Sequence, residues 1–462
     1  MEDNMKKVGI HDNNSDQVNF KNTSLELVDF PPQKNMEVNN LESIKIDNNP
    51  EKIDSESVIE RDPFGKVDQK SSTFQASMNL LKSYVGGGIL ALPYIFFKTG
   101  YLLATFAMIL TAALVYYSTL LLLELVADSG NKPVNVSEVF NRVLGRKASI
   151  IYKFFLGTYQ MGICISYAIF FTDFFQVAFG TENIPSMRII FACFSLVIIL
   201  PLSMINNFHF FVKFSNIGNL LILITLIAII QLDFTHLYTK QLNFNEHNFG
   251  TFTHLPSFIG VSIFAFECIG NIFPVKNSMK EPEKFKKMFS ITSIVVCLVY
   301  IVFSVICCVS LGVKINQIIL TDLEKIQSFF YIFQTFYAVA LILSYPIQFY
   351  PLVIILEDNY VINKYITTKG KYNWKRYVVR FIVTLIIFVL AFAIPKFASF
   401  LNLVGAFAGI NLQFVFPIIA YYSVFKLMAP KWKINLNFAV LVFGVIGSGF
   451  GIYDSIKEMS EK

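Results

Sequence analysis

Three consecutive glycines stand in the middle of the first long apolar run of the chain. Gly86, Gly87 and Gly88 follow one another there, and Pro93 comes five residues after the last of them. Each glycine costs a helix roughly 1 kcal/mol relative to alanine, and glycine lets an unwound main chain approach a ligand closely. We predict that the helix is broken at this point.

A second unusual segment lies in a later apolar run, just before Pro274. Glu267 and Gly270 interrupt the run, and Phe264 and Phe266 precede them. An acidic side chain at the centre of a membrane costs at least ~2.5–3.5 kcal/mol on insertion scales, so it usually faces a cavity or a partner. Two interpretations of Glu267 stay open: a protonatable or gating group, and a structural cap on a broken main chain.

An unwound helix exposes main-chain groups that suit the two ends of an α-amino acid. The half-helix that begins after Gly88 presents unpaired N–H groups and the positive end of a dipole, which favour a carboxylate. Carbonyl groups at 264–267 favour an ammonium group. We predict that the two segments together bind an amino acid zwitterion. The predicted substrate-binding residues are Gly86, Gly87, Gly88, Phe264, Phe266, Glu267 and Gly270.

The composition indicates that membrane helices position these segments. Hydrophobic residues make up 54% of 462 positions and charged residues 15%, against about a quarter charged in soluble domains. Apolar runs recur with lengths near the ~20 residues that cross the hydrocarbon as a helix, and main-chain groups in lipid must bond internally. We predict an all-α integral membrane protein with about eleven spans, near 74–97, 101–126, 150–179, 188–205, 214–232, 255–275, 289–311, 328–355, 378–395, 399–425 and 437–454.

Charge is distributed unevenly along the chain. Residues 1–72 carry 15 acidic and 9 basic residues without apolar periodicity, so we predict a disordered tail followed by a transmembrane domain over 73–462. With the tail in the cytosol, the cytosolic loops hold 19 Lys and Arg residues and the opposite side holds 8. This bias predicts a cytosolic N-terminus. The basic residues lie in short loops, so no nucleic-acid partner is expected.

The two interrupted runs are the first and the sixth spans, which occupy corresponding positions in two groups of five. Interrupted segments at matching positions are the best sequence indication of an inverted-repeat transporter. We predict a first repeat over about 74–232, a second over about 255–425, and an extra helix at about 437–454 outside the repeat.

The same residues carry a resemblance to a known family. Residues 72–76 with 81–93 resemble the first span of the amino acid/auxin permease family, closest to its proton-coupled branch. Residues 264–274 resemble the sixth span of that family, 344–350 the eighth, and 403–406 with Pro417 the tenth. The resemblance covers roughly 72–454 in span order. It implies a leucine-transporter-like 5+5 inverted repeat with one extra helix.

The chain departs from the proton-coupled branch at one position. A histidine linked to proton handling precedes Leu-Leu-Lys in the first span of that branch, and here the position is Asn79, which does not titrate. Ser344 matches a hydroxyl that sodium-coupled relatives place near an ion site, although a helical serine also bonds its own backbone. The predicted coupling or gating residues are Glu267, Asn79 and Ser344.

These observations predict a secondary transporter that moves amino acids by alternating access, coupled to H⁺, with Na⁺ as the alternative ion. A second hypothesis is an amino acid sensor that signals to cytosolic partners through its tail. No acid–base pair, nucleotide loop or metal-binding spacing is found in the sequence, so we expect neither an enzyme nor a cofactor. The expected partners are the amino acid and the lipid of a plasma membrane or an acidic-organelle membrane.

Overall fold

The structure of the chain is a computed structural model. It describes residues 71–127, 135–181, 184–205, 208–239, 250–312, 315–320, 331–357, 374–394 and 396–460. The predicted tail over 1–72 therefore lies outside the described residues, apart from Ser71 and Ser72.

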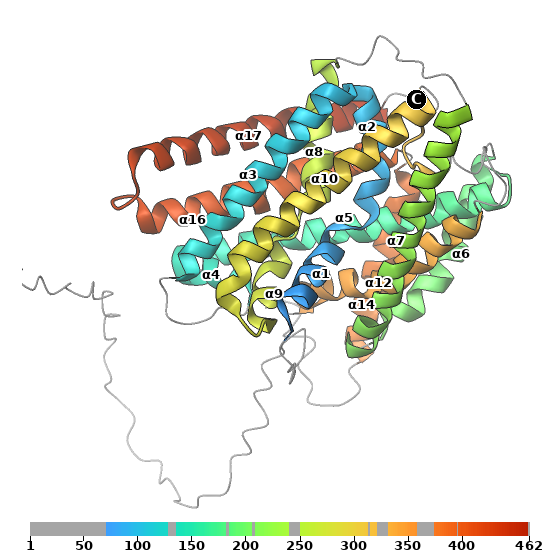
Figure 1. Ribbon diagram of the computed structural model, residues 1–462. Coiled ribbons are helices and arrows are strands. Elements are labelled where there is room, and N and C mark those ends of the chain that lie inside the picture. Colours follow the sequence, from blue (N-terminus) through green and yellow to red (C-terminus); the bar gives the residue numbers. More distant parts are fainter. Residues whose placement is uncertain are drawn as a thin grey trace, which may run out of the picture. The chain divides into compact units, whose positions relative to one another are not determined.

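The described residues form a bundle of helices, drawn in Figure 1. Among the described residues, ten helical stretches are long and apolar enough to cross a membrane, and the broken first span adds an eleventh. The prediction of an all-α protein with about eleven spans is confirmed. The continuous spans are α3 (Tyr101–Ala127), α5 (Arg146–Ala178), α6 (Pro185–Ser203), α7 (Phe208–Thr239), α10 (Phe285–Leu311), α12 (Tyr331–Glu357), α14 (Trp374–Ala393) and α17 (Lys431–Ser460).

Three spans are built from shorter pieces. The first consists of α1 (Thr73–Tyr84), a short 3₁₀ segment (Gly87–Ala91) and α2 (Leu92–Thr99). The sixth consists of α8 (Leu255–Phe266), a 3₁₀ turn (Ile269–Asn271) and α9 (Ile272–Ser278). The tenth runs from α15 (Phe397–Val404) to α16 (Phe416–Phe425) through two π-helical segments, Gly405–Gly409 and Asn411–Val415.

Several helices are longer than the predicted spans. The fifth was expected over 214–232 and is Phe208–Thr239, and the last was expected over 437–454 and is Lys431–Ser460. Most of the predicted cytosolic loop at 206–213 is therefore the first turn and a half of α7. Hydropathy locates only the part of a helix that lies in hydrocarbon, whereas the hydrogen-bonded backbone continues into the interface.

A short helix, α4 (Val136–Leu144), lies in a segment that was expected to be a loop. Asn135 caps its first turn through a side-chain oxygen that accepts a main-chain N–H at 3.0 Å. Val139 and Phe140 are buried, and the Phe140 ring lies 4.7 Å from the ring of Tyr152 in α5. The apolar face is too short for a spanning helix but is sufficient to dock α4 against α5.

Helices of the two predicted repeats pack in exchanged pairs. The second span, α3, packs on α8 of the sixth, while the seventh span, α10, packs on α1 and α2 of the first. The third span, α5, packs on α15 of the tenth, while the eighth span, α12, packs on α7, the fifth. This exchange is what two halves related by a two-fold axis in the membrane plane produce. It brings the two broken helices into contact with each other.

Helices α8 and α15 cross where only glycine fits. A Cβ on Gly405 would overlap the main-chain oxygen of Gly260, and a Cβ on Gly260 would overlap the side chain of Asn402. Asn402 is fully buried and donates through Nδ2 to the main-chain oxygen of Gly451 in α17 at 3.0 Å. Small residues thus allow the sixth and tenth spans to approach each other closely.

We predict that Gly405→Ala destabilises the protein by about 1–3 kcal/mol, because the added methyl group collides with main chain that cannot move aside. The measurement is the thermal unfolding midpoint of the purified protein in detergent. Gly449→Ala is the matched control, since no atom lies within 4 Å of its added Cβ. Its midpoint should equal or slightly exceed that of the wild type, because alanine favours helix over glycine. Equal midpoints for the two variants would contradict the close crossing.

Candidate functional site

Both predicted helix breaks are present in the structure. In the first span α1 ends at Tyr84, Val85 and Gly86 are extended, and helix resumes at Gly87. Figure 1 shows α1 and α2 as separate pieces joined by this non-helical stretch. In the sixth span α8 ends at Phe266, and helix resumes at Ile269.

The two breaks touch each other. A Cβ on Gly88 would lie 3.2 Å from Cδ1 of Phe264 and 3.3 Å from Cα of Ala265, so the main chains of the two spans are separated by the width of a glycine. The preceding glycine faces α5 instead, where a Cβ on Gly87 would lie 3.5 Å from the hydroxyl of Ser166. The glycines therefore have two neighbours, the broken sixth span and the third span.

The first break leaves main-chain donors at its helical side. The first hydrogen bond of the 3₁₀ segment runs from the N–H of Ile89 to the oxygen of Gly86, at 3.3 Å. The N–H groups of Gly87 and Gly88 precede that bond and have no acceptor within the segment. Together with the dipole of the helical residues that follow, they form a donor pair at the contact between the two broken helices.

A tyrosine of the seventh span contacts the main chain at both breaks. The hydroxyl of Tyr300, which is fully buried, lies 2.6 Å from the main-chain oxygen of Tyr84 and 3.0 Å from that of Ala265. Both oxygens belong to the last turns of the helices that end at the breaks. A hydroxyl has a single proton, so it donates fully to one of these oxygens at a time.

Two further tyrosines complete this arrangement. The hydroxyl of Tyr337 in α12 donates to the oxygen of Gly86 at 2.9 Å, and that of Tyr159 in α5 donates to the oxygen of Phe264 at 2.7 Å. The carbonyl groups of Phe264 and Ala265, which the sequence suggested for an ammonium group, therefore each already accept a hydroxyl. An unpaired carbonyl in an apolar interior is costly, and the neighbouring helices supply these donors.

Glu267 lies within the second break and caps the helix that follows. Its Oε1 accepts the main-chain N–H of Ile269 at 3.0 Å. The side chain is half-buried. A carboxylate bonded to the first N–H of a helical segment is the geometry of a structural cap, and it also links the charge of this carboxyl group directly to the broken main chain.

The other predicted residues of the sixth span differ in their surroundings. Phe264 packs against the ring of Tyr159 at 5.4 Å, and Phe266 is buried with its ring 5.2 Å from that of Tyr300. Gly270 has no atom within 4 Å of the place where a Cβ would stand. The two phenylalanines thus hold the tyrosines in position, while Gly270 borders open space.

The side chains of the predicted coupling residues Asn79 and Ser344 are not hydrogen-bonded to the breaks, although the hydroxyl of Ser83 links the main chain of Asn79 to Asn271 of the sixth span. Asn79 is exposed on α1, and its main-chain oxygen accepts the hydroxyl of Ser83 at 3.2 Å. Ser344 donates to the main-chain oxygen of Ala340, one turn earlier in its own helix, at 2.8 Å. This is the backbone-bonding alternative for a helical serine.

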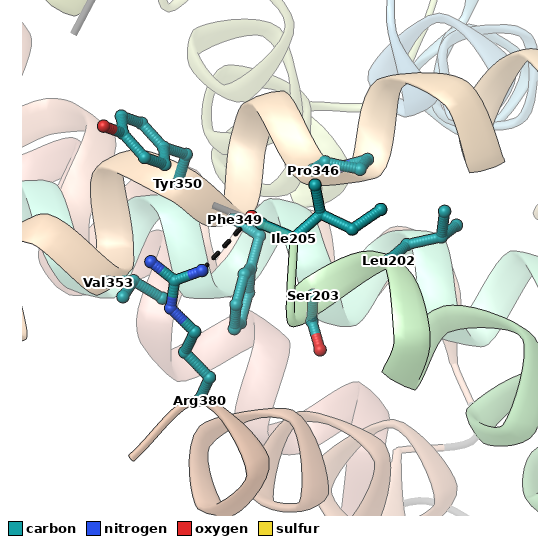
Figure 2. A pocket seen from close by; sticks show the side chains of 8 residues that line it. All are labelled: Leu202, Ser203, Ile205, Pro346, Phe349, Tyr350, Val353 and Arg380. Atoms are coloured by element: carbon teal, nitrogen blue, oxygen red, sulfur yellow. Dashed lines mark hydrogen bonds between the residues drawn. The ribbon is translucent and has the colours of Figure 1, made fainter. Parts of the chain in front are cut away.

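A small cavity of about 10 Å³, enough for about one water molecule, lies elsewhere, among α6, α12 and α14. Figure 2 shows the side chains that line it, with Arg380 donating to the main-chain oxygen of Ile205 at 3.2 Å. The guanidinium also lies 3.5 Å from the carboxylate of Glu357. None of the predicted site residues lines this cavity, and we interpret Arg380 as a structural residue that ties the chain just after α6 to α14.

Sequence reasoning did not identify the three tyrosines. A tyrosine inside an apolar span needs a partner for its hydroxyl, so its presence there indicates a buried hydrogen bond. The chain has 21 tyrosines, however, and the sequence does not indicate which three lie at the breaks. Within the residues that the structure describes, no three His, Cys, Asp or Glu side chains gather as metal ligands.

The fold and the paired breaks define a class of protein, a multi-span helical membrane protein with the leucine-transporter-like inverted repeat. Two solved structures show the same fold. MhsT in complex with L-phenylalanine matches with a TM-score of 0.50 and 12% identity, covering 84% of this chain and 99% of MhsT. Mhp1, a nucleobase-cation-symport-1 family transporter in a closed conformation, matches with a TM-score of 0.50 and 13% identity, covering 85% and 94%.

Residues 69–457 match the family described as "Transmembrane amino acid transporter protein", and the chain belongs to this family. The resemblance to the amino acid/auxin permeases is thereby confirmed.

Curated relatives agree with this assignment. The chain is 27% identical to vacuolar amino acid transporter 3 of Saccharomyces cerevisiae, covering 86% of this chain and 58% of the yeast protein. It is 25% identical to amino acid transporter AVT3C of Arabidopsis thaliana, covering 86% and 93%. It is 24% identical to the proton-coupled amino acid transporter-like protein pathetic of Drosophila melanogaster, covering 89% and 91%. The chain spans little more than half the length of the yeast relative, and all three names describe transporters rather than enzymes.

We predict that Tyr300→Phe lowers the free energy of unfolding by about 1–3 kcal/mol, because it leaves a buried carbonyl group without a donor. The measurement is again the thermal unfolding midpoint in detergent. Tyr453→Phe, on the 67% exposed Tyr453 side chain of α17, is the control and should leave the midpoint unchanged. A Tyr300→Phe protein as stable as this control would show that the bridge between the two breaks contributes nothing.

Proposed function

We propose that this chain is a secondary transporter that moves amino acids across a membrane by alternating access. The observation that carries the proposal is the contact between the two broken helices, where Gly88 lies against Phe264 and Ala265 of the sixth span. At this contact the N–H groups of Gly87 and Gly88 precede the first hydrogen bond of their helical segment. Every α-amino acid has one carboxylate and one ammonium group. A site built from main-chain groups binds what all amino acids share and leaves selection to side chains.

The carboxylate end of the substrate is assigned to the first break. The N–H groups of Gly87 and Gly88 point out of a helical start, where donors and dipole both favour a negative charge. The third span borders this place with the hydroxyls of Ser166 and Tyr167. The missing side chains of the glycines leave the main chain accessible to the ligand.

The ammonium end is assigned to the carbonyl groups around Tyr300. The Tyr300 hydroxyl lies within hydrogen-bond distance of the oxygens of Tyr84 and Ala265 but donates its single proton to one of them at a time. Each carbonyl oxygen has two lone pairs, so an ammonium group with three donors binds both without expelling the tyrosine. Such a contact would pull the first and sixth spans toward the same ligand, which is the event that alternating access requires.

We assign the coupling ion as H⁺ and the proton-binding group as Glu267. This carboxyl group is bonded to the main chain of the second break, so a change in its charge acts directly on the substrate site. The resemblance to the proton-coupled branch and the name of the Drosophila relative support the same ion. The yeast relatives are named for the vacuole, and we propose an acidic-organelle membrane with the N-terminus in the cytosol.

The test of the proposal is reconstitution in liposomes with labelled amino acids under separate H⁺ and Na⁺ gradients. We expect uptake driven by a pH gradient and at least about a tenfold loss of it in Gly87→Val, because the valine methyl groups cover the N–H groups of the site. Gly449→Val is the matched control on α17, where no atom lies within 4 Å of the new Cβ. Uptake by Gly87→Val equal to that control would contradict the proposed site, and absence of gradient-driven uptake of any amino acid by the wild type would contradict the function.

We predict that Glu267→Gln removes the pH dependence of transport. The glutamine keeps an oxygen that accepts the N–H of Ile269 but neither binds nor releases a proton. Initial rates measured across a series of external pH values at fixed substrate concentration should then give a flat profile, against a sloping one for the wild type. A variant with the wild-type profile would show that Glu267 is a structural cap and that another group carries the proton.

A further inference from the structure

At one end of the bundle, the extra helix α17 contacts segments of three other spans. Its last turns contain Asp454 and Glu458. They lie beside the end of α2, the beginning of α8 and the beginning of α15. These three helices belong to the first, sixth and tenth spans. Two of them, α2 and α8, are the halves of the broken first and sixth spans that lie at this end of the bundle. In the predicted orientation this face is the non-cytosolic one.

Glu458 joins the first span to the tenth. One carboxylate oxygen lies 3.1 Å from Nζ of Lys98, at the end of α2, and the other accepts the hydroxyl of Ser399 in α15 at 2.6 Å. The ammonium group of Lys396, just before α15, donates to the main-chain oxygen of Glu458. The Glu458 side chain is 15% exposed and that of Lys98 is 31% exposed, so the ion pair is partly shielded from solvent.

Asp454 and Asn402 make the matching connection to the sixth span. The hydroxyl of Ser257, in the first turn of α8, donates to the carboxylate of Asp454. The same hydroxyl accepts Nδ2 of Asn402 at 3.0 Å, and Nδ2 also donates to the main-chain oxygen of Gly451 in α17 at 3.0 Å. The sixth, tenth and last helices are therefore held in one hydrogen-bonded network.

A helix that needed only an anchor in the bundle could use close packing, which α17 already has with α8 and α15. Placing carboxylates in a mostly buried position is costly unless their partners are well arranged. Such a group stabilises one arrangement of its partners strongly and every other arrangement weakly. The network is thus suited to selecting a single relative position of α2, α8 and α15.

We propose that Glu458 is a positioning residue: through Lys98 and Ser399 it ties the end of α2 to the beginning of α15 and keeps this face of the protein closed, and separation of the Lys98–Glu458 pair is a step in opening it. This inference rests on the proposed alternating-access function. On this proposal α17, the helix outside the repeat, determines how readily the non-cytosolic face opens.

A natural cysteine reports on the opening. Cys308, in the last turn of α10, is buried and donates through Sγ to the main-chain oxygen of Pro93 in α2 at 3.2 Å. The helix that Lys98 anchors therefore covers this thiol. Movement of α2 away from α10 exposes Cys308, whereas Cys164, which is fully buried in α5, reports on general loosening of the bundle.

The experiment measures the rate at which a membrane-impermeant thiol reagent labels Cys308 in the full-length protein in lipid nanodiscs, with the labelled peptide identified by mass spectrometry. We expect Glu458→Gln to raise this rate by about tenfold, because the glutamine has no charge to pair with Lys98 and only one acceptor oxygen for the two donors. Lys457→Gln, an exposed neighbour on the same helix, is the control and should leave the rate unchanged. The charge swap Lys98→Glu with Glu458→Lys should restore slow labelling.

Three results would overturn the proposal. They are equal labelling rates in Glu458→Gln and Lys457→Gln, a parallel rise at Cys164, and fast labelling in the charge-swap variant. Labelling is measured without substrate, so its outcome is independent of amino acid transport. A protein that shows the expected labelling but no gradient-driven uptake would contradict the proposed function and leave the positioning role of Glu458 in place.

Discussion

Main-chain N–H and C=O groups inside a bilayer must find partners within the protein, because neither lipid nor bulk water supplies them. Breaking two helices in the apolar interior creates several such groups at once, and the surroundings of the breaks follow from that demand. Tyr159, Tyr300 and Tyr337 donate to carbonyl groups at the ends of the broken helices, and Glu267 accepts an N–H where the sixth span resumes. The N–H groups of the first break are the donors that we propose for the ligand.

The inverted repeat explains how donors from distant parts of the sequence reach the breaks. The exchanged packing of α3 on α8 and of α10 on α1 and α2 places each broken helix against the second helix of the opposite repeat. Tyr300 comes from one of these helices and reaches both breaks. The glycine crossing of α8 and α15 draws the tenth span into the same centre. Close packing at the glycines therefore makes the polar contacts possible, because it brings the main chains near enough for single side chains to bridge them.

The sequence predicts the breaks well because their causes are local. Three adjacent glycines, and a carboxylate with a glycine in an apolar run, disfavour helix whatever surrounds them, and span order follows from hydropathy. The tyrosine partners depend on which helices become neighbours, which no local pattern encodes. The same holds for Asn402, whose amide bonds Ser257 and Gly451 across three helices. The short helix α4 was missed for a different reason, since its apolar face is too brief to appear as a span.

The position of Glu267 gives a reason why a structural cap and a proton-binding group need not be different residues. An ionised carboxylate accepts a main-chain N–H in a charge-assisted bond that is roughly twice as strong as the bond to a neutral acceptor. When the carboxyl group gains a proton, its hold on Ile269 weakens at the point where the sixth span changes from extended chain to helix. In the proposed cycle, the arrival of a proton therefore becomes a change in the stability of the break itself. A histidine side chain at the position of Asn79, on the exposed side of α1, would lack this direct connection, which is a physical reason to propose the sixth span as the place of coupling.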